Sequence, residues 1–274
     1  LIYLRELARR TGQAGTGYPF NAPVLSHLDA LAFTQPVTIL TGENGSGKTT
    51  LLELAAAGVR ADTIGTGGNR ARKTRTFVKA AQKYRFTFNQ RPVRSFFFTA
   101  EDFTRYLDDR RAMQEEAREA LREIDETYDS RSAMAKSLAQ MPHMSTLSDL
   151  DGQYERELLE ASHGEGFLSF FAGRLISNGL YLLDEPEGAL SFANQLGLLA
   201  LIDQAEGMNC QVILATHSPV LCAYPGAQLI DIDDGALQVA SYDTLAGIRF
   251  IKYFLANRAG VLRQAGIEGL PGKL

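Results

Sequence analysis

Cysteine is scarce in this chain of 274 residues, and long apolar runs are absent. The two cysteines, Cys210 and Cys222, can form neither a disulfide framework nor a zinc site, so we expect core residues in a reducing compartment. No apolar run approaches the roughly 20 residues that span a bilayer, which predicts no membrane insertion. The stretch 1–7 has no signal-peptide pattern, because Arg5 and Glu6 interrupt it. These absences favour a cytoplasmic protein.

A strong net charge is also lacking. The formal net charge of -4 gives no overall attraction to nucleic acid or to anionic membranes. The hydrophobic content of 45% and the charged content of 22% are ordinary for a soluble globular protein. The charge is nevertheless uneven, because residues 63–100 hold nine Lys and Arg but no Asp or Glu, whereas acids dominate residues 101–160. We expect one large α/β domain with a small subdomain.

A glycine-rich segment follows the apolar run Val37–Leu40. It reads Gly-Glu-Asn-Gly-Ser-Gly-Lys-Thr-Thr from residue 42 and matches the phosphate-binding pattern G-x-x-x-x-G-K-[ST]. The run before it predicts a buried strand, and a helix is predicted to begin at Lys48. A glycine-rich turn that matched the pattern by chance would not need a strand directly before it and a helix directly after it. The predicted phosphate-binding residues are Glu43, Asn44, Gly45, Ser46, Gly47, Lys48, Thr49 and Thr50, with the Thr49 hydroxyl also binding Mg²⁺.

Two carboxylates end a second apolar run, Leu180–Leu183. Adjacent carboxylates at the end of a buried strand cost desolvation free energy unless a cation or polar partner offsets it. We therefore expect Asp184 to hold Mg²⁺ and Glu185 to orient or deprotonate an attacking water. The alternative is a solvated Asp-Glu-Pro turn. The phosphate-binding pattern upstream favours the nucleotide site.

A third polar segment, Thr216-His217-Ser218, follows the apolar run Val212–Ala215. A lone histidine is usually structural. This one ends the predicted strand about thirty residues after the carboxylates, so His217 can reach a γ-phosphate as a donor or polariser.

The pattern of apolar runs predicts a mostly parallel sheet covered by helices on both faces. Residues 65–73 are predicted to form a mobile loop, and residues 141–144 a helix break. The remaining predicted strands are Ile2–Leu7, Tyr84–Phe88, Arg94–Thr99 and Leu229–Ile232. The remaining predicted helices span 103–128, 192–205, 219–222, 248–255 and 261–264. We divide the chain into an N-terminal core lobe (1–100), a helical subdomain (101–175) and a C-terminal core lobe (176–274).

The order of these motifs resembles the ATP-binding-cassette (ABC) ATPase class. The chain is most similar to stand-alone bacterial predicted ATPases of this class, often labelled AAA-family ATPases. The shared segments are Tyr-Pro-Phe at 18–20, the glycine-rich loop, Ser-His-Gly-Glu at 162–165, Leu-Asp-Glu-Pro-Glu at 183–187 and Ala-Thr-His-Ser-Pro at 215–219. The resemblance implies an α/β P-loop NTPase fold of ABC type, with an antiparallel β portion near the N-terminus and a helical subdomain.

The resemblance also implies a signature motif that opens a helix. Ser162, Gly164 and Glu165 stand at its nucleotide-binding positions, with His163 in place of the usual first glycine. A second anion-binding helix end on one chain makes sense if it serves a neighbour's ATP. We therefore expect a head-to-tail homodimer on ATP binding, with residues 187–191 along the interface. The alternative is an ordinary helix cap.

Two further assignments follow from the resemblance. An aromatic side chain upstream of the phosphate loop is expected to stack on adenine, and Tyr18 and Phe20 are the candidates. Both are alternatively core or loop anchors. A polar residue at the end of the strand before the helical subdomain is expected near Mg²⁺ and the attacking water. Glu101 is the candidate for that position.

The leading functional hypothesis is a Mg²⁺-dependent ATPase that drives conformational change in a partner. One alternative is the nucleotide-binding subunit of a membrane transporter. It is disfavoured because Ser191 replaces the Asp that many transporter-type relatives carry. Another is a DNA-associated repair or defence ATPase, favoured by the basic stretch 70–75 unless that stretch is a solvated loop.

Overall fold

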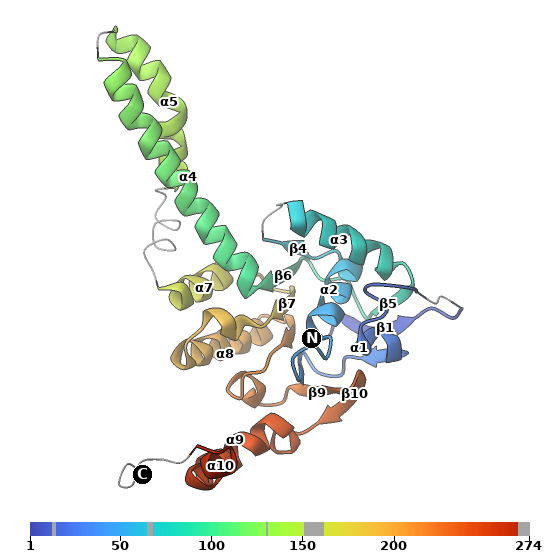
Figure 1. Ribbon diagram of the computed structural model, residues 1–274. Helices are drawn as coiled ribbons and strands as arrows, with labels where there is room; N and C mark the ends of the chain where they lie inside the picture. The colour runs from blue at the N-terminus through green and yellow to red at the C-terminus, as the bar shows by residue number, and fades with distance from the viewer. Residues whose placement is uncertain (13–14, 65–67, 130, 151–161, 268–274) are drawn as a thin grey trace.

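The computed structural model describes residues 1–12, 15–64, 68–129, 131–150 and 162–267. Its larger sheet crosses the body of the molecule (Figure 1). Every neighbouring pair of strands in it is parallel except β9 with β10, which confirms the predicted mostly parallel sheet. The strands run in the order β10 (Ala236–Ala240), β9 (Gln228–Asp233), β3 (Val37–Gly42), β8 (Gln211–Ala215), β7 (Leu180–Asp184), β6 (Ser95–Thr99) and β4 (Asp62–Thr63).

A smaller antiparallel sheet lies near the N-terminus, as expected. Its strands are β2 (Ala30–Ala32), β1 (Leu4–Arg9) and β5 (Tyr84–Phe88), with β1 in the centre. The helices α1 (Pro23–His27) and α2 (Lys48–Val59) pack beside it. Buried residues of β1, α2 and β7 belong to one apolar cluster, which includes Leu4, Leu52 and Leu182. Helix α2 is therefore held between the two sheets, and residues 43–47 connect it to the end of β3.

A second apolar cluster covers the opposite face of the larger sheet. Alternate residues of β7 divide between the faces, since Tyr181 and Leu183 join this cluster whereas Leu180 and Leu182 join the first. Helices α4 (Ala100–Thr127), α7 (His163–Ala172) and α8 (Phe192–Gly207) contribute to it. Its aromatic centre consists of Phe96, Phe98, Phe103, Phe167, Phe170, Phe171 and Tyr181. Burial on both faces explains why the strands read as continuous apolar runs.

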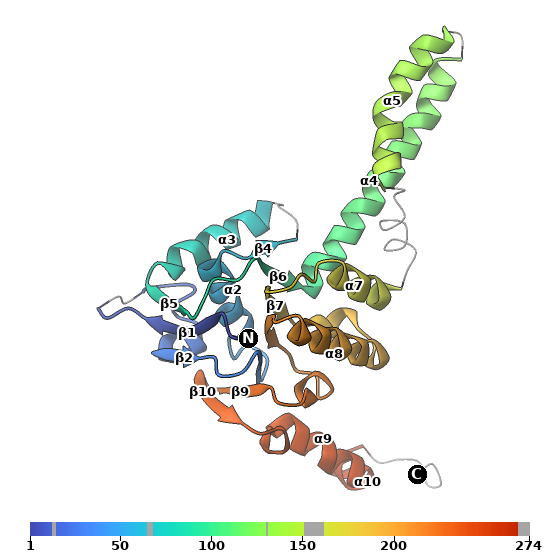
Figure 2. The ribbon, with the colours of Figure 1, turned by 180° about the vertical axis from the view of Figure 1, so that it is seen from behind.

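A hairpin of α4 and α5 (Ala133–Leu150) projects from the body (Figures 1 and 2). Helix α4 begins where β6 ends, and the Thr99 side chain caps it by accepting a hydrogen bond from the Asp102 N–H at 2.9 Å. The predicted break at residues 141–144 is wrong, because Pro142 lies inside α5. The cost of an interior proline is offset by contacts with α4, among them the hydrogen bond from Gln140 to Asp125.

The predicted loop over residues 65–73 is also wrong for the part of it that the structure describes. Helix α3 spans Gly68–Ala81. Alanine, arginine and lysine are good helix formers, and the buried Phe77 and Ala80 anchor the helix to the apolar cluster around α2. The composition and three glycines of residues 65–73 suggested a loop, but tertiary packing selects the helix.

The C-terminal part contains short turns and two helices. They are η1 (Pro186–Ala189), η2 (Leu221–Ala223), η3 (Tyr242–Thr244), α9 (Ala246–Ala256) and α10 (Arg258–Gln264). The helix predicted over 219–222 is only the 3₁₀ turn η2. Both cysteines are buried and unpaired by disulfides, as expected for core residues. No helix within the described ranges is long and apolar enough to cross a membrane.

Candidate nucleotide site

The loop between β3 and α2 needs glycine at two positions. Gly42 has φ 140° and Gly47 has φ 101°, values that side-chain-bearing residues rarely adopt. A Cβ at Gly47 would lie 2.5 Å from Val24 Cγ1, and one at Gly42 would lie 2.3 Å from the Ile232 carbonyl oxygen. The backbone therefore turns in a space that only glycine fits, and it leads directly into the N-terminus of α2. Such a turn is suited to an anion.

Lys48 is the first residue of α2 and is only 3% exposed. Its Nζ donates hydrogen bonds to the carbonyl oxygens of Gly42 and Glu43, both at 3.0 Å. Burial lowers the pKa of Lys48, and the nearby carboxylates, those of Glu185 and Asp184 first, oppose that shift. The ammonium thus lies inside the loop, where phosphate oxygens would replace the two carbonyls as acceptors.

Thr49 and Asp184 meet at the carboxyl edge of the sheet. The Thr49 hydroxyl donates to Asp184 Oδ1 at 3.1 Å, and Asp184 is 7% exposed. Hydroxyl and carboxylate oxygens fit Mg²⁺, which usually keeps waters and phosphate oxygens as its other ligands. No group of three or more His, Cys, Asp and Glu suited to a metal occurs among the described residues. The two side chains therefore fit a metal ion whose other ligands come from phosphate and water.

Glu185 and His217 form a pair at the ends of β7 and β8. His217 Nε2 lies 2.9 Å from Glu185 Oε1, and both side chains are partly exposed. Glu185 has φ 45° and ψ 51°, a left-handed conformation that is uncommon for a residue with a side chain. Its N–H donates to the Ala215 carbonyl at 2.9 Å, which continues the pairing of the two strands. The strand ends thus bring the predicted base and the predicted polariser together.

Two residues of this region were not predicted as site residues. Glu187 Oε1 accepts hydrogen bonds from the Thr216 hydroxyl at 2.7 Å and from the His217 N–H at 2.6 Å. Gln195 is buried in α8, accepts from the Ser218 hydroxyl and donates to the Leu190 carbonyl. Glu187 carried a signal, because it is a third acid directly after Asp-Glu-Pro. Gln195 carried no such signal in the sequence, because it is a single amide in an apolar helix.

The structure does not place Glu101 with the Thr49–Asp184 pair. Strand β6 ends at Thr99, and Glu101 lies in the first turn of α4. Its side chain is 81% exposed and forms an ion pair with Arg105 at 2.6 Å. The expectation that Glu101 ends the strand is corrected, because α4 begins three residues before the predicted start at Phe103.

The two adenine candidates differ in their surroundings. Tyr18 is 56% exposed, and its ring meets Phe77 edge-to-face at 5.8 Å. Phe20 packs against the apolar cluster around α2, with the Lys83 ammonium 5.0 Å from its ring centroid. Of the two side chains, Tyr18 is the more exposed, because Phe20 is partly buried.

Ser162 caps α7 through a capping box. Its Oγ accepts from the Glu165 N–H, and Glu165 Oε2 accepts from the Ser162 N–H at 3.3 Å. Gly164 is buried, and a Cβ there would lie 2.2 Å from Asn194 Nδ2. The start of α7 therefore sits close against α8. Its aromatic residues pack on the opposite face of the sheet from α2.

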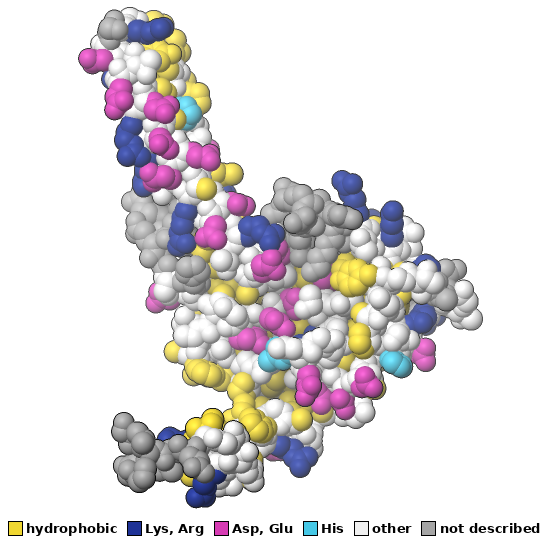
Figure 3. All heavy atoms as spheres, viewed as in Figure 1, with side chains coloured by type: hydrophobic (Ala, Val, Ile, Leu, Met, Phe, Trp, Pro, Cys, Tyr) yellow, Lys and Arg dark blue, Asp and Glu magenta, His cyan; other side chains and the backbone are white. Residues whose placement is uncertain are grey.

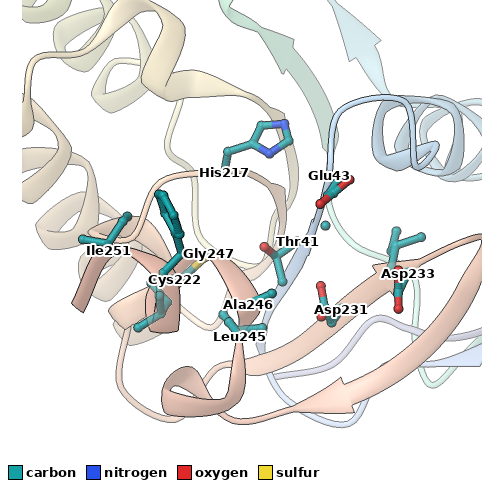
Figure 4. Close-up of a pocket in the computed structure, with 14 residues that line it drawn as sticks. Thr41, Glu43, His217, Cys222, Asp231, Asp233, Leu245, Ala246, Gly247 and Ile251 are labelled. Atoms are coloured by element: carbon teal, nitrogen blue, oxygen red, sulfur yellow. The ribbon is translucent and has the colours of Figure 1, made fainter. Parts of the chain in front are cut away.

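A pocket of about 560 Å³ lies beside the phosphate loop (Figure 4). Glu43 and His217 line one part of it, Asp231 and Asp233 of β9 another, and apolar residues of α9 a third. Burial and the neighbouring Asp233 raise the pKa of Asp231. Acidic side chains also gather in the middle of the face shown in Figure 3. Of the predicted site residues only Glu43 and His217 line the pocket, so it flanks the phosphate loop.

The fold and these contacts define a P-loop nucleotide-binding protein of the α/β class. The family model described as an AAA domain matches residues 23–165, which is more than half of the chain. The chain therefore belongs to the AAA domain family. The match includes the phosphate loop and the hairpin, and it ends before Asp184.

Part of the chain is also similar in sequence to an ABC transporter protein. An uncharacterized ABC transporter ATP-binding protein of Haemophilus influenzae is 31% identical over 80 residues, which are 29% of this chain and 30% of that protein. The chain thus matches less than a third of this relative's length.

Two solved structures resemble the chain over most of its length. An ATP-binding cassette of an ABC transporter in its ADP conformation is 15% identical with a TM-score of 0.47, over 97% of this chain and 99% of that one. The protein cbiO1 from Clostridium perfringens, part of the ABC transporter complex cbiONQ, is 13% identical with a TM-score of 0.48, over 96% of this chain and 100% of that one. These identities and TM-scores are low, so the assignment of the fold depends on the sheet topology described above.

Proposed function

We propose that the protein is a Mg²⁺-dependent ATPase that hydrolyses the β–γ phosphoanhydride of ATP. The contact that carries the proposal is the Thr49–Asp184 hydrogen bond at 3.1 Å, directly beside the buried Lys48. It joins the residue after the phosphate-loop lysine to the carboxylate at the last position of β7. A bound Mg²⁺ would supply charge neutralisation of the β- and γ-phosphates.

The chain's own residues divide the work of hydrolysis. Lys48 and the N–H groups of the loop bind the phosphates and orient them. Glu185 accepts the proton of the attacking water at its carboxylate, and the pair with His217 holds that carboxylate in place. In this proposal the His217 imidazole would also donate to a γ-phosphate oxygen as negative charge shifts in the transition state.

The active assembly in this proposal is a head-to-tail homodimer with ATP in its interface. The start of α7 and the start of α2 belong to helices that pack on opposite faces of the sheet. In this proposal the N-terminus of α7, capped by Ser162, binds the nucleotide of the neighbouring subunit. Gly164 allows the start of α7 to pack close to α8. Closure and separation of the dimer would transmit motion to a partner.

Glu185→Gln tests the proposal. The amide keeps the shape but cannot accept a proton, so turnover should fall at least about 10²-fold while ATP affinity is retained. Light scattering on this variant should show a dimer with Mg-ATP and a smaller species without it. Wild-type turnover in the variant would remove Glu185 as the base. A monomer at tens of micromolar under both conditions would remove the sandwich.

The partner is proposed by class only. The basic residues of α3 favour a DNA-associated role, which predicts binding that weakens steeply with salt. Co-purification of a membrane protein would instead favour a transporter subunit. A pull-down with the ATP-trapped Glu185→Gln variant distinguishes the two.

A further inference from the structure

The side chain of Glu187 joins the loops that follow β7 and β8. A single oxygen, Oε1, receives both the Thr216 hydroxyl at 2.7 Å and the His217 N–H at 2.6 Å. Glu187 itself is held in the turn η1, where its carbonyl accepts from the Leu190 N–H at 3.1 Å. A carboxylate that receives two short hydrogen bonds is a stronger tie than two neutral contacts.

Hydrogen bonds hold each residue of the segment 216–218 that Glu187 contacts. Thr216 is fully buried, and its hydroxyl accepts from the Ser218 N–H at 2.9 Å while it donates to Glu187. The Ser218 hydroxyl in turn donates to the buried Gln195. His217 lies between these two anchored residues, and its imidazole projects to Glu185. The backbone position of His217 therefore determines whether its ring reaches the carboxylate.

We propose that Glu187 is a positioning residue that holds His217 against Glu185, and this rests on the proposed ATPase function for its catalytic meaning. Glu187 contacts the backbone of His217, and His217 contacts Glu185 at 2.9 Å. Glu187 thus acts through His217 and touches no reacting atom. Its other oxygen, Oε2, is buried and has no hydrogen-bond partner within the described residues, so the carboxylate is not placed by any competing contact.

The first test separates turnover from binding. Glu187→Ala should lower kcat by about 10²-fold, the scale of a misplaced catalytic group, and leave ATP affinity within about threefold. Glu187→Gln should recover most of the loss, because its amide carbonyl can accept both hydrogen bonds. The matched control is Glu206→Ala, which removes a carboxylate that accepts the Tyr224 hydroxyl at 2.9 Å and leaves the strand ends intact. If Glu187→Gln were as impaired as Glu187→Ala, the proposed positioning role of Glu187 would be refuted.

The second test is a double-mutant cycle with His217→Ala. If Glu187 acts through His217, the double variant should be no slower than His217→Ala alone. A tie that only stabilises the fold gives a different result, because its effect multiplies with the loss of the imidazole. Multiplying effects would therefore overturn the proposal.

A third test does not require hydrolysis. The chain has four histidines, so ring-labelled protein gives four sets of imidazole signals, and His217→Ala identifies the relevant set. At one fixed pH, Glu187→Ala should shift the His217 ring signals, whereas Glu187→Gln and Glu206→Ala should leave them in place. Unchanged ring signals in Glu187→Ala would refute the positioning role. A wild-type protein without ATPase activity would instead refute the proposed function and leave this measurement valid.

Discussion

Replacing Lys48 with alanine should weaken the binding of Mg-ATP by about two orders of magnitude. The ammonium makes two hydrogen bonds to loop carbonyls at 3.0 Å. Two charge-assisted bonds to phosphate oxygens would contribute about 3–6 kcal/mol, and the two bonds given up subtract about 1–3 kcal/mol. The remainder is about 2.5 kcal/mol, which corresponds to a factor of roughly 10² in affinity.

Calorimetry with Mg-ATP measures this change directly. The matched control is Lys252→Ala, which removes an exposed lysine that pairs with Asp243. Its affinity should equal that of the wild type. Thermal unfolding of both variants shows whether each is folded, because Lys48 is buried and its removal alters the loop. Equal affinities for Lys48→Ala and the control, with both proteins folded, would refute the assignment of the phosphate loop.

Two further outcomes follow from burial, and a third follows from the exposed side chain of Tyr18. Cys210 and Cys222 should not react with a thiol reagent at pH 8 in the folded protein and both should react in denaturant, because burial raises the pKa of each thiol. The free energy of unfolding, measured with urea, should fall between about pH 9 and 12 by on the order of a few kcal/mol. Burial raises the pKa of Cys222 to about 11 and that of Tyr181 to about 12, so the unfolded chain loses these protons first and the stability is complete only below both unfolded values. Tyr18→Ala should weaken ATP binding by about two- to tenfold in calorimetry, the scale of one aromatic stacking contact, whereas Phe20→Leu should leave it unchanged.

The central strands of the larger sheet could be predicted from the sequence because they are apolar on both faces. The predicted bounds of β7 and β8 differ from the structure by one residue at one end, and those of β5 in the smaller sheet agree with it. The phosphate loop was visible because its glycines are required by the backbone itself. Such signals are local, and a single sequence displays them.

The errors arose where distant packing decides the conformation. The first part of helix α3 was predicted as a loop, from the glycines and charges of residues 65–73, but the buried Phe77 anchors the helix. Pro142 suggested a break, yet α5 is held along α4. Glu101 was placed at a strand end, whereas the Thr99 cap starts the helix before it.

The contacts of Glu187 could not be predicted for a related reason. Its partners lie 29 and 30 residues further along the chain, on the next strand's loop. No periodicity or spacing specifies such a side-chain tie. It follows only from the register that places the ends of β7 and β8 side by side.

A small rotation at the base of the α4–α5 hairpin would displace its far end by a much larger distance than the base. Helix α4 has 28 residues and is therefore about 42 Å long, and its base is Thr99, which pairs in register with Asp184. Each degree of rotation at that base displaces the far end by about 0.7 Å, as follows from this length. A tilt of five degrees carries the tip through about 4 Å, close to the width of a side chain. The hairpin would act as a lever arm whose base lies beside Asp184, the proposed Mg²⁺ ligand.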